Sequence, residues 1–231
     1  IHKLQPQCII NSRIGNGLGD FKVSEQKLTA DGPVQPWESC ITMSANWGFN
    51  KHDAAWKSSE LLVRNVVEVV SKGGNLLLNV GPNGEGEFPG PAIQKLTEIG
   101  KWMKVNHDAL YGTKPWNGNV NQTAAAQEKE AGPTVKSTMK DAVNDATSKK
   151  IIPDIRFTTK GDRIFVFARS WKSADVSLPG FSKIKIKDIS LLGSGSKIKW
   201  QQAGDKVTMW LPQTLPQGVP VYVFKLRYIN L

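Results

Sequence analysis

The stretch SKGGNLLLNVGPNGEGEFPGPA, residues 71–92, decides the fold of the region around it. It starts at the end of a helix-like segment, runs through the apolar residues NLLLNV (75–80) and finishes in a loop rich in Gly and Pro. A continuous apolar run of this length predicts a strand buried on both faces, as in a parallel sheet. The Gly- and Pro-rich continuation predicts either a strand-end loop beside a binding site or a simple tight turn.

Amphipathic helices are predicted on both sides of this strand. Upstream, SSELLVRNVVEVVSKGG (58–74) has apolar residues at helical spacing, a cap at Ser58 or Ser59 and a Gly-Gly ending. Downstream, GPAIQKLTEIGKWMKVNHDAL (90–110) has a proline in its first turn. Its apolar stripe is predicted to comprise Ile93, Leu96, Ile99, Trp102 and Met103.

Two further strands are predicted upstream, at CIINSR (8–13) and SCITMSANW (39–47). Short strands that alternate with helices indicate a parallel α/β architecture. Because three strands cannot close a sheet, we expect the remaining strands to precede Ile1 and the chain to be a fragment.

The pattern changes in the second half of the chain. Residues 117–150 form a polar, Ala- and Lys-rich insertion that includes a glycosylation sequon at Asn121. From residue 151 the apolar residues recur with period two, and DIRFTTKGDRIFVFARSW (154–171) predicts a hairpin with Gly161-Asp162 at its turn. Short strands at this spacing predict an antiparallel β-sandwich.

The positive charge is concentrated in that second half. The net charge of the chain is +10, and residues 1–115 account for only +1 of it. A basic region of this kind could bind nucleic acid or anionic glycans. In the segment KIKIKDI, however, the lysines alternate with isoleucines, which predicts one solvated strand face. We therefore expect no nucleic-acid partner.

Metal and membrane functions have no support in the sequence. Cys8 and Cys40 are too few for a disulfide framework, and we expect both to be buried free thiols. The three histidines lack the spacing of metal ligands. No apolar run approaches the roughly 20 residues that span a membrane. We expect no cofactor, no metal and no membrane partner.

Candidate site residues follow the predicted strands, because binding sites of parallel α/β folds gather at the carboxyl ends of strands. They are Asn11, Arg13, Asp20 and Glu25 after the first strand; Trp37, Glu38, Trp47 and Phe49 around the second; and Asn79, Gly81 and Pro82 after the third. Aromatic rings pack on the C–H patches of a pyranose, Arg and Asn bind hydroxyl groups, and carboxylates act on the glycosidic oxygen. The set therefore favours a sugar site. The loop NVGPNGEG lacks both phosphate-binding patterns, GxGxxG and the Lys-Ser/Thr of a P-loop.

Several segments together resemble one known family. They are INSRIGN, PWESCITMSANWGFN, VSKGGNLLLNVGP and IGKWMKVNHDALYGTKPW. Over about residues 4–116 the chain resembles the α-L-fucosidases of glycoside hydrolase family 29, and the β-rich remainder is similar to that family's C-terminal domain. The resemblance implies an α/β plus all-β fold: the C-terminal part of a (β/α)8-like barrel (1–116), a polar insertion or linker (117–150) and a β-sandwich (151–231).

The resemblance also implies a mechanism and its residues. It implies a retaining exo-glycosidase that releases terminal α-L-fucose through an Asp nucleophile, and the matching Asp would lie upstream of Ile1. Glu25, in the loop after GDF, matches the acid/base position, and Glu38 is the second choice. Arg13 matches an arginine beside the nucleophile, and Trp47 matches an aromatic residue that lines the fucose pocket.

Structural roles remain open for the same residues. Arg13 could pair only with Asp20, Glu38 could brace a strand, and Trp47 could belong to the core. The alternative function is a fucose- or glycan-binding protein without catalysis on the same fold.

The expected partners are a fucosylated glycan and the missing N-terminal half of the catalytic domain, on the same or a separate chain. A homo-oligomer is left open. We expect a secreted, periplasmic or lysosomal location rather than a cytoplasmic one.

Overall fold

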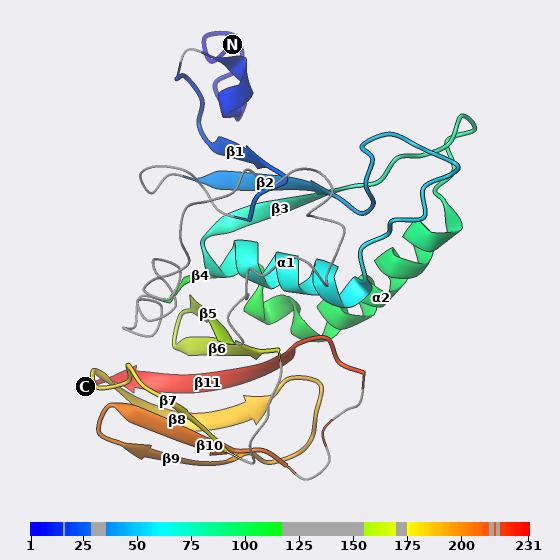
Figure 1. Ribbon diagram of the computed structural model, residues 1–231. Helices are drawn as coiled ribbons and strands as arrows, with labels where there is room; N and C mark the ends of the chain where they lie inside the picture. The colour runs from blue at the N-terminus through cyan, green and yellow to red at the C-terminus, as the bar shows by residue number, and fades with distance from the viewer. Residues whose placement is uncertain (16, 29–35, 117–154, 170–174, 213–214, 216–217) are drawn as a thin grey trace, which may run out of the picture.

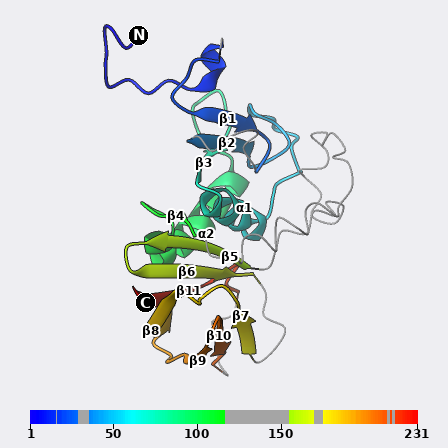
Figure 2. The same ribbon diagram turned by 90° about the vertical axis from the view of Figure 1, so that its left-hand side faces the viewer.

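The structure is a computed structural model that describes residues 1–15, 17–28, 36–116, 155–169, 175–212, 215 and 218–231. Its elements form four layers, in the order parallel sheet, helix pair, five-stranded antiparallel sheet and three-stranded antiparallel sheet (Figures 1 and 2). The predicted insertion 117–150, with Asn121, lies outside the described residues. The two predicted architectures, parallel α/β and antiparallel β, are therefore packed against each other through the helices.

The parallel sheet has the strand order β1-β2-β3. Its strands are β1 (Lys22–Glu25), β2 (Trp37–Thr42) and β3 (Gly74–Asn79). Both strand pairs are parallel, and the register places Glu25 opposite Cys40 and Cys40 opposite Leu77. On the face that carries Glu25, the register therefore gives three successive rows of side chains from the amino to the carboxyl ends of the strands: Val23–Glu38–Asn75, Glu25–Cys40–Leu77 and Thr42–Asn79.

The predicted strand at residues 8–13 is wrong. Asn11 makes only an isolated bridge to Phe21, and the chain then turns into the 3₁₀ helix η1 (Ser12–Ile14). The cause is local, because the Asn11 side chain accepts a hydrogen bond from the backbone N–H of Arg13 at 3.0 Å. Side chains of this type offer the backbone an alternative to strand pairing. The strand beside β2 is β1 instead, and it ends at Glu25.

Helix α1 (Ser59–Ser71) forms where the sequence predicts it. Ser58 caps its first turn by accepting a hydrogen bond from Leu61 N, and Gly73 ends it with a φ of 80°. The next glycine, Gly74, makes room for the Trp37 ring, which would lie 2.4 Å from a Cβ at that position. The indole N–H of Trp37 donates to the carbonyl of Lys72 at 3.3 Å. The Gly-Gly pair thus couples the end of the helix to the start of β3.

Helix α2 (Gly90–Asn106) also forms as predicted, with Pro91 in its first turn, and the short helix η2 (His107–Ala109) follows it. Its buried apolar residues include Ile99 and Trp102. The predicted stripe is wrong at its first member, because Ile93 is 52% exposed. In the first turn the core contact is made by the neighbouring Ala92, which is 0% exposed, so the buried stripe begins one residue earlier than predicted.

The second half forms two antiparallel sheets. The five-stranded sheet has the order β4-β5-β6-β11-β8, and the three-stranded sheet has the order β7-β10-β9. The bounds are β4 (Lys114–Pro115), β5 (Ile155–Lys160), β6 (Arg163–Ala168), β7 (Asp175–Leu178), β8 (Ile184–Leu191), β9 (Lys199–Ala203), β10 (Lys206–Trp210) and β11 (Tyr222–Asn230). The predicted hairpin is confirmed: β5 and β6 pair around a two-residue turn, Gly161-Asp162.

Strand β6 is buried on both faces. Ile164, Val166 and Ala168 belong to the core between the two antiparallel sheets. The alternate residues, Phe165 and Phe167, belong to a second core with the helices and β2. In β8 the alternation separates core from solvent instead: Ile186 is buried, while Lys187 is exposed, as the KIKIKDI pattern predicts. The five-stranded sheet therefore serves both cores.

A buried ion pair joins helix α1 to strand β5. Arg156 donates two hydrogen bonds to the Glu68 carboxylate, at 2.7 and 2.8 Å. Burial alone raises the pKa of Glu68, but the hydrogen bonds and positive charge of Arg156, aided by Lys72, bring the pKa below its usual value. Trp102 adds a hydrogen bond from its indole to the carbonyl of Val221 at 2.8 Å. The junction between the parallel and antiparallel parts is thus held by directional polar contacts as well as by apolar packing.

Both cysteines are free, but only Cys40 is buried, so the expectation of two buried thiols is wrong for the half-exposed Cys8. None of the described helices is both long and apolar enough to cross a membrane. The described part of the chain contains no group of three acidic, His or Cys side chains that could hold a metal ion.

Candidate active site

The two faces of the parallel sheet have different neighbours. Ile41 and Leu76 point toward α1 and belong to the core there. The opposite face carries the residues of alternate register, which are Val23, Glu25, Glu38, Cys40, Thr42, Asn75, Leu77 and Asn79. The prediction that the strand NLLLNV is buried on both faces is wrong, because Leu77, on this second face, is 47% exposed. Among the described elements, strand β3 pairs only with β2, and the second face is covered by no α-helix; only the short helix η1 reaches it, beside β1.

Arg13 and Glu25 form an ion pair over this second face. One guanidinium nitrogen, Nη2, donates to Oε2 of Glu25 at 2.6 Å and lies 3.6 Å from the sulfur of Cys40. The hydrogen bond that Arg13 donates to Glu25, together with the negative charge of that carboxylate, raises the pKa of Arg13. Glu25 is the last residue of β1, not a loop residue as predicted. The carboxylate therefore has a defined direction, set by a strand and by a cation.

Arg13 does not pair with Asp20, the structural alternative. Asp20 instead accepts a hydrogen bond from the backbone N–H of Ile10 at 2.7 Å and lies 3.4 Å from His2. The pairing of Arg13 with Glu25 spans twelve residues and depends on η1 turning back toward β1.

Glu38 lies on the same face but farther from the carboxyl edge. Its register partners are Val23 on β1 and Asn75 on β3. Glu25, Cys40 and Leu77 form the next layer toward the carboxyl ends of the strands. Glu38 therefore lies one layer farther from the carboxyl edge than the Arg13–Glu25 pair. Its side chain is half-buried.

Trp47 lies in the loop between β2 and α1, at the carboxyl edge of the sheet. Its backbone carbonyl accepts a hydrogen bond from the side-chain amide of Asn79 at 2.7 Å. Asn79 is the last residue of β3 and pairs in register with Thr42. The structure thus brings Trp47 to the same edge as Glu25 through its backbone, and the side chain of Trp47 is half-buried.

The base of that loop is closed by a buried lysine, which the sequence did not single out. Lys57 is 4% exposed, and its ammonium donates to the carbonyls of Thr42 at 2.7 Å and Ser44 at 3.3 Å. Burial lowers its pKa. Its only sequence signal is its position just before the helix cap, because hydrogen-bond partners on a distant strand end cannot be read from spacing.

The middle of the loop is organised around Asp53, which also went unnoticed. Its carboxylate accepts hydrogen bonds from Asn46 Nδ2 and from Ala55 N, each at 3.0 Å. Burial alone raises the pKa of Asp53, but these hydrogen bonds and one from Ser44 bring it below the usual value. Asp53 is therefore held as an anion inside the loop.

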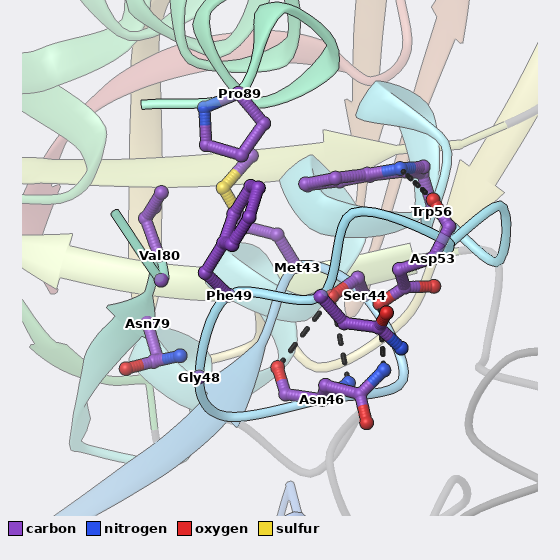
Figure 3. A pocket seen from close by; sticks show the side chains of 12 residues that line it. Met43, Ser44, Asn46, Gly48, Phe49, Asp53, Trp56, Asn79, Val80 and Pro89 are labelled. Atoms are coloured by element: carbon purple, nitrogen blue, oxygen red, sulfur yellow. Dashed lines mark hydrogen bonds between the residues drawn. The ribbon is translucent and has the colours of Figure 1, made fainter. Parts of the chain in front are cut away.

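A small pocket lies between this loop and the loop after β3. Figure 3 shows Phe49, Trp56 and Pro89 around it, with Asn46 and Asp53 at one side. Its cavity volume is about 10 Å³, which is room for roughly one water molecule. It is too small for a sugar, and Arg13, Glu25 and Trp47 do not line it.

Two sequence models of protein families match the chain. The model described as Alpha-L-fucosidase matches residues 1–108, and the model described as Alpha-L-fucosidase C-terminal domain matches residues 147–227. The two matches follow each other without overlap and together take in most of the chain.

Curated relatives and solved structures agree with these matches. An Alpha-L-fucosidase from Branchiostoma floridae is 27% identical over 222 residues, which are 92% of this chain and 43% of the relative. The solved Alpha-L-fucosidase isoenzyme 1 from Paenibacillus thiaminolyticus is 29% identical with a TM-score of 0.75, and the match covers 99% of this chain and 52% of that one. A Thermotoga maritima alpha-fucosidase solved with a mechanism-based inhibitor is 25% identical with a TM-score of 0.69, over 98% of this chain and 47% of that one. The chain thus spans about half the length of the relatives that it matches.

Proposed function

Because the chain belongs to the α-L-fucosidase family, we propose that the protein carrying it is a retaining exo-glycosidase that releases terminal α-L-fucose from glycans or glycoconjugates. The observation that carries the proposal is the Glu25 carboxylate, held 2.6 Å from Arg13 at the carboxyl edge of a parallel sheet. Carboxylates at such edges perform the acid–base chemistry of many (β/α)-barrel enzymes.

We assign the three parallel strands to the C-terminal part of a (β/α)8-like barrel. In such a barrel the helices surround the strands, and the other face of the sheet points to the barrel interior. Helix α1 covers one face of this sheet, and the opposite face carries polar and charged side chains. Polar residues on the face without helices support this assignment.

Glu25 is the proposed general acid and base. In the first step it would protonate the glycosidic oxygen, and in the second it would accept a proton from the attacking water. The layer position favours Glu25 over Glu38, since Glu25 lies nearer to the carboxyl edge, where substrates enter barrel sites. Arg13 would hold the Glu25 carboxylate in place and interact with the nucleophile or the sugar beside it.

The nucleophile is proposed to be an Asp from polypeptide outside these 231 residues. A retaining mechanism needs a second carboxyl group about 5–5.5 Å from the first. The second carboxylate on this face, Glu38, lies one layer deeper than Glu25. The share of the relatives that the chain spans leaves room for a residue of this kind elsewhere in the protein.

Trp47 is the proposed contact to the apolar side of fucose. The methyl group and C–H bonds of a deoxysugar pack well against an indole face. Its placement at the same edge as Glu25, through Asn79, supports this role.

The proposal is tested in the complete protein with Glu25→Ala and the matched variant Glu38→Ala. Glu25→Ala should lower kcat/KM on a fucoside with a poor leaving group by about 10²–10⁴-fold, because the leaving oxygen is no longer protonated. On an activated aryl fucoside the loss should be smaller, and azide should restore turnover as a fucosyl azide is formed. Steady-state rates and product analysis give these values.

The matched variant Glu38→Ala distinguishes Glu25 from Glu38 as the acid/base residue. If Glu38→Ala shows the azide rescue and Glu25→Ala does not, Glu38 is the acid/base. If the wild-type protein binds L-fucose but cleaves no fucoside, the protein is the glycan-binding alternative.

A further inference from the structure

We propose that Asn79 is a positioning residue that holds the loop after β2 so that Trp47 meets the substrate. The inference rests on the proposed function, because the substrate contact of Trp47 belongs to it. Asn79 touches the loop backbone and acts through Trp47.

The loop provides its own frame at its base and middle but not at Trp47. Lys57 closes the base, with its backbone N–H on the carbonyl of Met43 at 2.9 Å and its ammonium on Thr42 and Ser44. Asp53 holds the middle through Asn46. Both sets of contacts leave residues 47–49 to be held from another element.

That element is the end of β3. The Asn79 amide donates to the carbonyl of Trp47 at 2.7 Å, which is a short and well-formed hydrogen bond. Asn79 is itself anchored, because its backbone carbonyl accepts from Met43 N at 3.3 Å and its strand pairs with β2. The Asn79 side chain thus fixes the backbone of Trp47 relative to the sheet.

A close backbone contact reinforces the hydrogen bond. A Cβ at Gly81 would lie 2.6 Å from both the carbonyl carbon of Gly48 and the nitrogen of Phe49. Atoms do not approach so closely, so any larger residue at position 81 would push residues 48 and 49 away from the strand end. Asn79, which binds the carbonyl of Trp47, and Gly81, which packs against Gly48 and Phe49, therefore act together as one latch.

The expected kinetic signature follows from this geometry. Loss of the latch lets Trp47 move, which weakens binding of the sugar in the ground state and raises KM. Neither Asn79 nor Gly81 titrates, so the pH profile of kcat should keep its shape in Asn79→Ala and Gly81→Ala. A loss of folded protein would instead lower kcat at constant KM.

The test compares Asn79→Ala and the isosteric Asn79→Asp with Asn75→Ala in the complete protein. Asn75 lies on the same strand and the same face as Asn79, but at the amino end, where it is exposed. KM for an aryl α-L-fucoside and Kd for L-fucose should rise about tenfold in both Asn79 variants and stay within about twofold for Asn75→Ala. Gly81→Ala should reproduce the rise by displacing the same segment.

A double-mutant cycle with Trp47→Ala shows whether Asn79 acts through Trp47. In a Trp47→Ala background, Asn79→Ala should change Kd for L-fucose by less than about twofold. An unchanged KM in both Asn79 variants, or a full effect without the indole, would overturn the latch while fucosidase activity stands. A wild-type protein that neither cleaves fucosides nor binds L-fucose would overturn the proposed function and the latch with it. Should Asn79→Ala not fold, Asn79→Asp and Gly81→Ala decide the same question.

Discussion

The two faces of the parallel sheet hold similar numbers of side chains but serve different purposes. On the helix face, Trp37, Ser39 and Ile41 are 4%, 0% and 3% exposed. On the opposite face, Leu77 is 47% exposed, and the side chain of Glu25 is 45% exposed. One face is a core shared with the helices and the five-stranded sheet. On the other, Cys40 and Thr42 of the central strand are buried, but the two outer strands present Glu25 and Leu77 to solvent.

The difference shows where stability and chemistry reside in this chain. Buried apolar contacts and the Glu68–Arg156 pair stabilise the helix side. The opposite side keeps an ion pair that water can reach, and exposed pairs contribute little to stability. Substitutions should therefore affect stability on one face and activity on the other.

The largest effect on stability is expected for Arg156→Ala, on the helix side. The substitution leaves the Glu68 carboxylate buried, with Lys72 as its remaining charged partner among the described residues, and such losses cost about 3–5 kcal/mol. Urea denaturation of the complete protein measures this change. Arg163→Ala is the matched control, since Arg163 is 42% exposed and 3.8 Å from Asp108, and it should cost less than about 0.5 kcal/mol. Equal costs for the two arginines would mean that the buried Glu68–Arg156 pair contributes no more to stability than an exposed pair.

Ile41→Ala and Leu77→Ala compare the two faces directly on adjacent strands. Ile41→Ala should cost about 2–5 kcal/mol, because it opens a cavity in the core below the sheet. In the 231-residue chain, Leu77→Ala should cost less than about 1 kcal/mol, since its side chain is half in water. A loss at Leu77 as large as that at Ile41 in the complete protein would show that further polypeptide covers this face, as the barrel assignment requires.

A smaller effect is expected from acid, through Glu68. Its pKa in the folded protein lies below the usual value near 4.5, so its contribution to stability is complete above that pH. The contribution is lost as the pH falls through the folded pKa. Free energies of unfolding from pH 6 to pH 2.5 should therefore converge for the wild type and Glu68→Gln. A gap that widens toward low pH would mean that Arg156 does not stabilise the ionised carboxylate.

The smallest change in stability is expected for Glu25→Gln. The Arg13–Glu25 pair is about half exposed, so its loss should shift the free energy of unfolding by less than about 0.5 kcal/mol. Thermal denaturation checks this expectation alongside the activity. A large destabilisation would place Glu25 among the structural residues, and the loss of activity in Glu25→Ala would then have a different explanation.

Local signals in the sequence were sufficient where one residue decides a local conformation. One of the two predicted cap residues, Ser58, caps α1, and Gly73 ends the helix as predicted. Gly161 lies in the turn of the β5–β6 hairpin, also as predicted. Patterns that depend on neighbours were less reliable. The apolar run of β3 suggested burial on both faces, yet the strand buried on both faces is β6, which packs between two cores.

In the candidate site, too, the sequence identified single residues but not the contacts between distant segments. Arg13, Glu25 and Trp47 were named from the sequence through their resemblance to a family, and the ion pair between the first two appears in the structure. Lys57 and Asp53 were not foreseen as parts of this edge, and Asn79 and Trp47 were named there without their contact being foreseen. Lys57 and Asn79 bind main-chain carbonyls, and Asp53 binds an amide and a backbone N–H of its own loop. Residue spacing does not reveal such partners.

By itself, the sequence determined the alternation of strands and helices, the change to antiparallel strands and the family to which the chain belongs. These properties depend on residue types and short periods along the chain. Only the tertiary structure decided which sheet face is open, that Arg13 pairs with Glu25 rather than Asp20, and that Asn79 reaches Trp47. Register and the turn at Asn11 set these outcomes, because a shift of one residue in a strand reverses every side chain that follows.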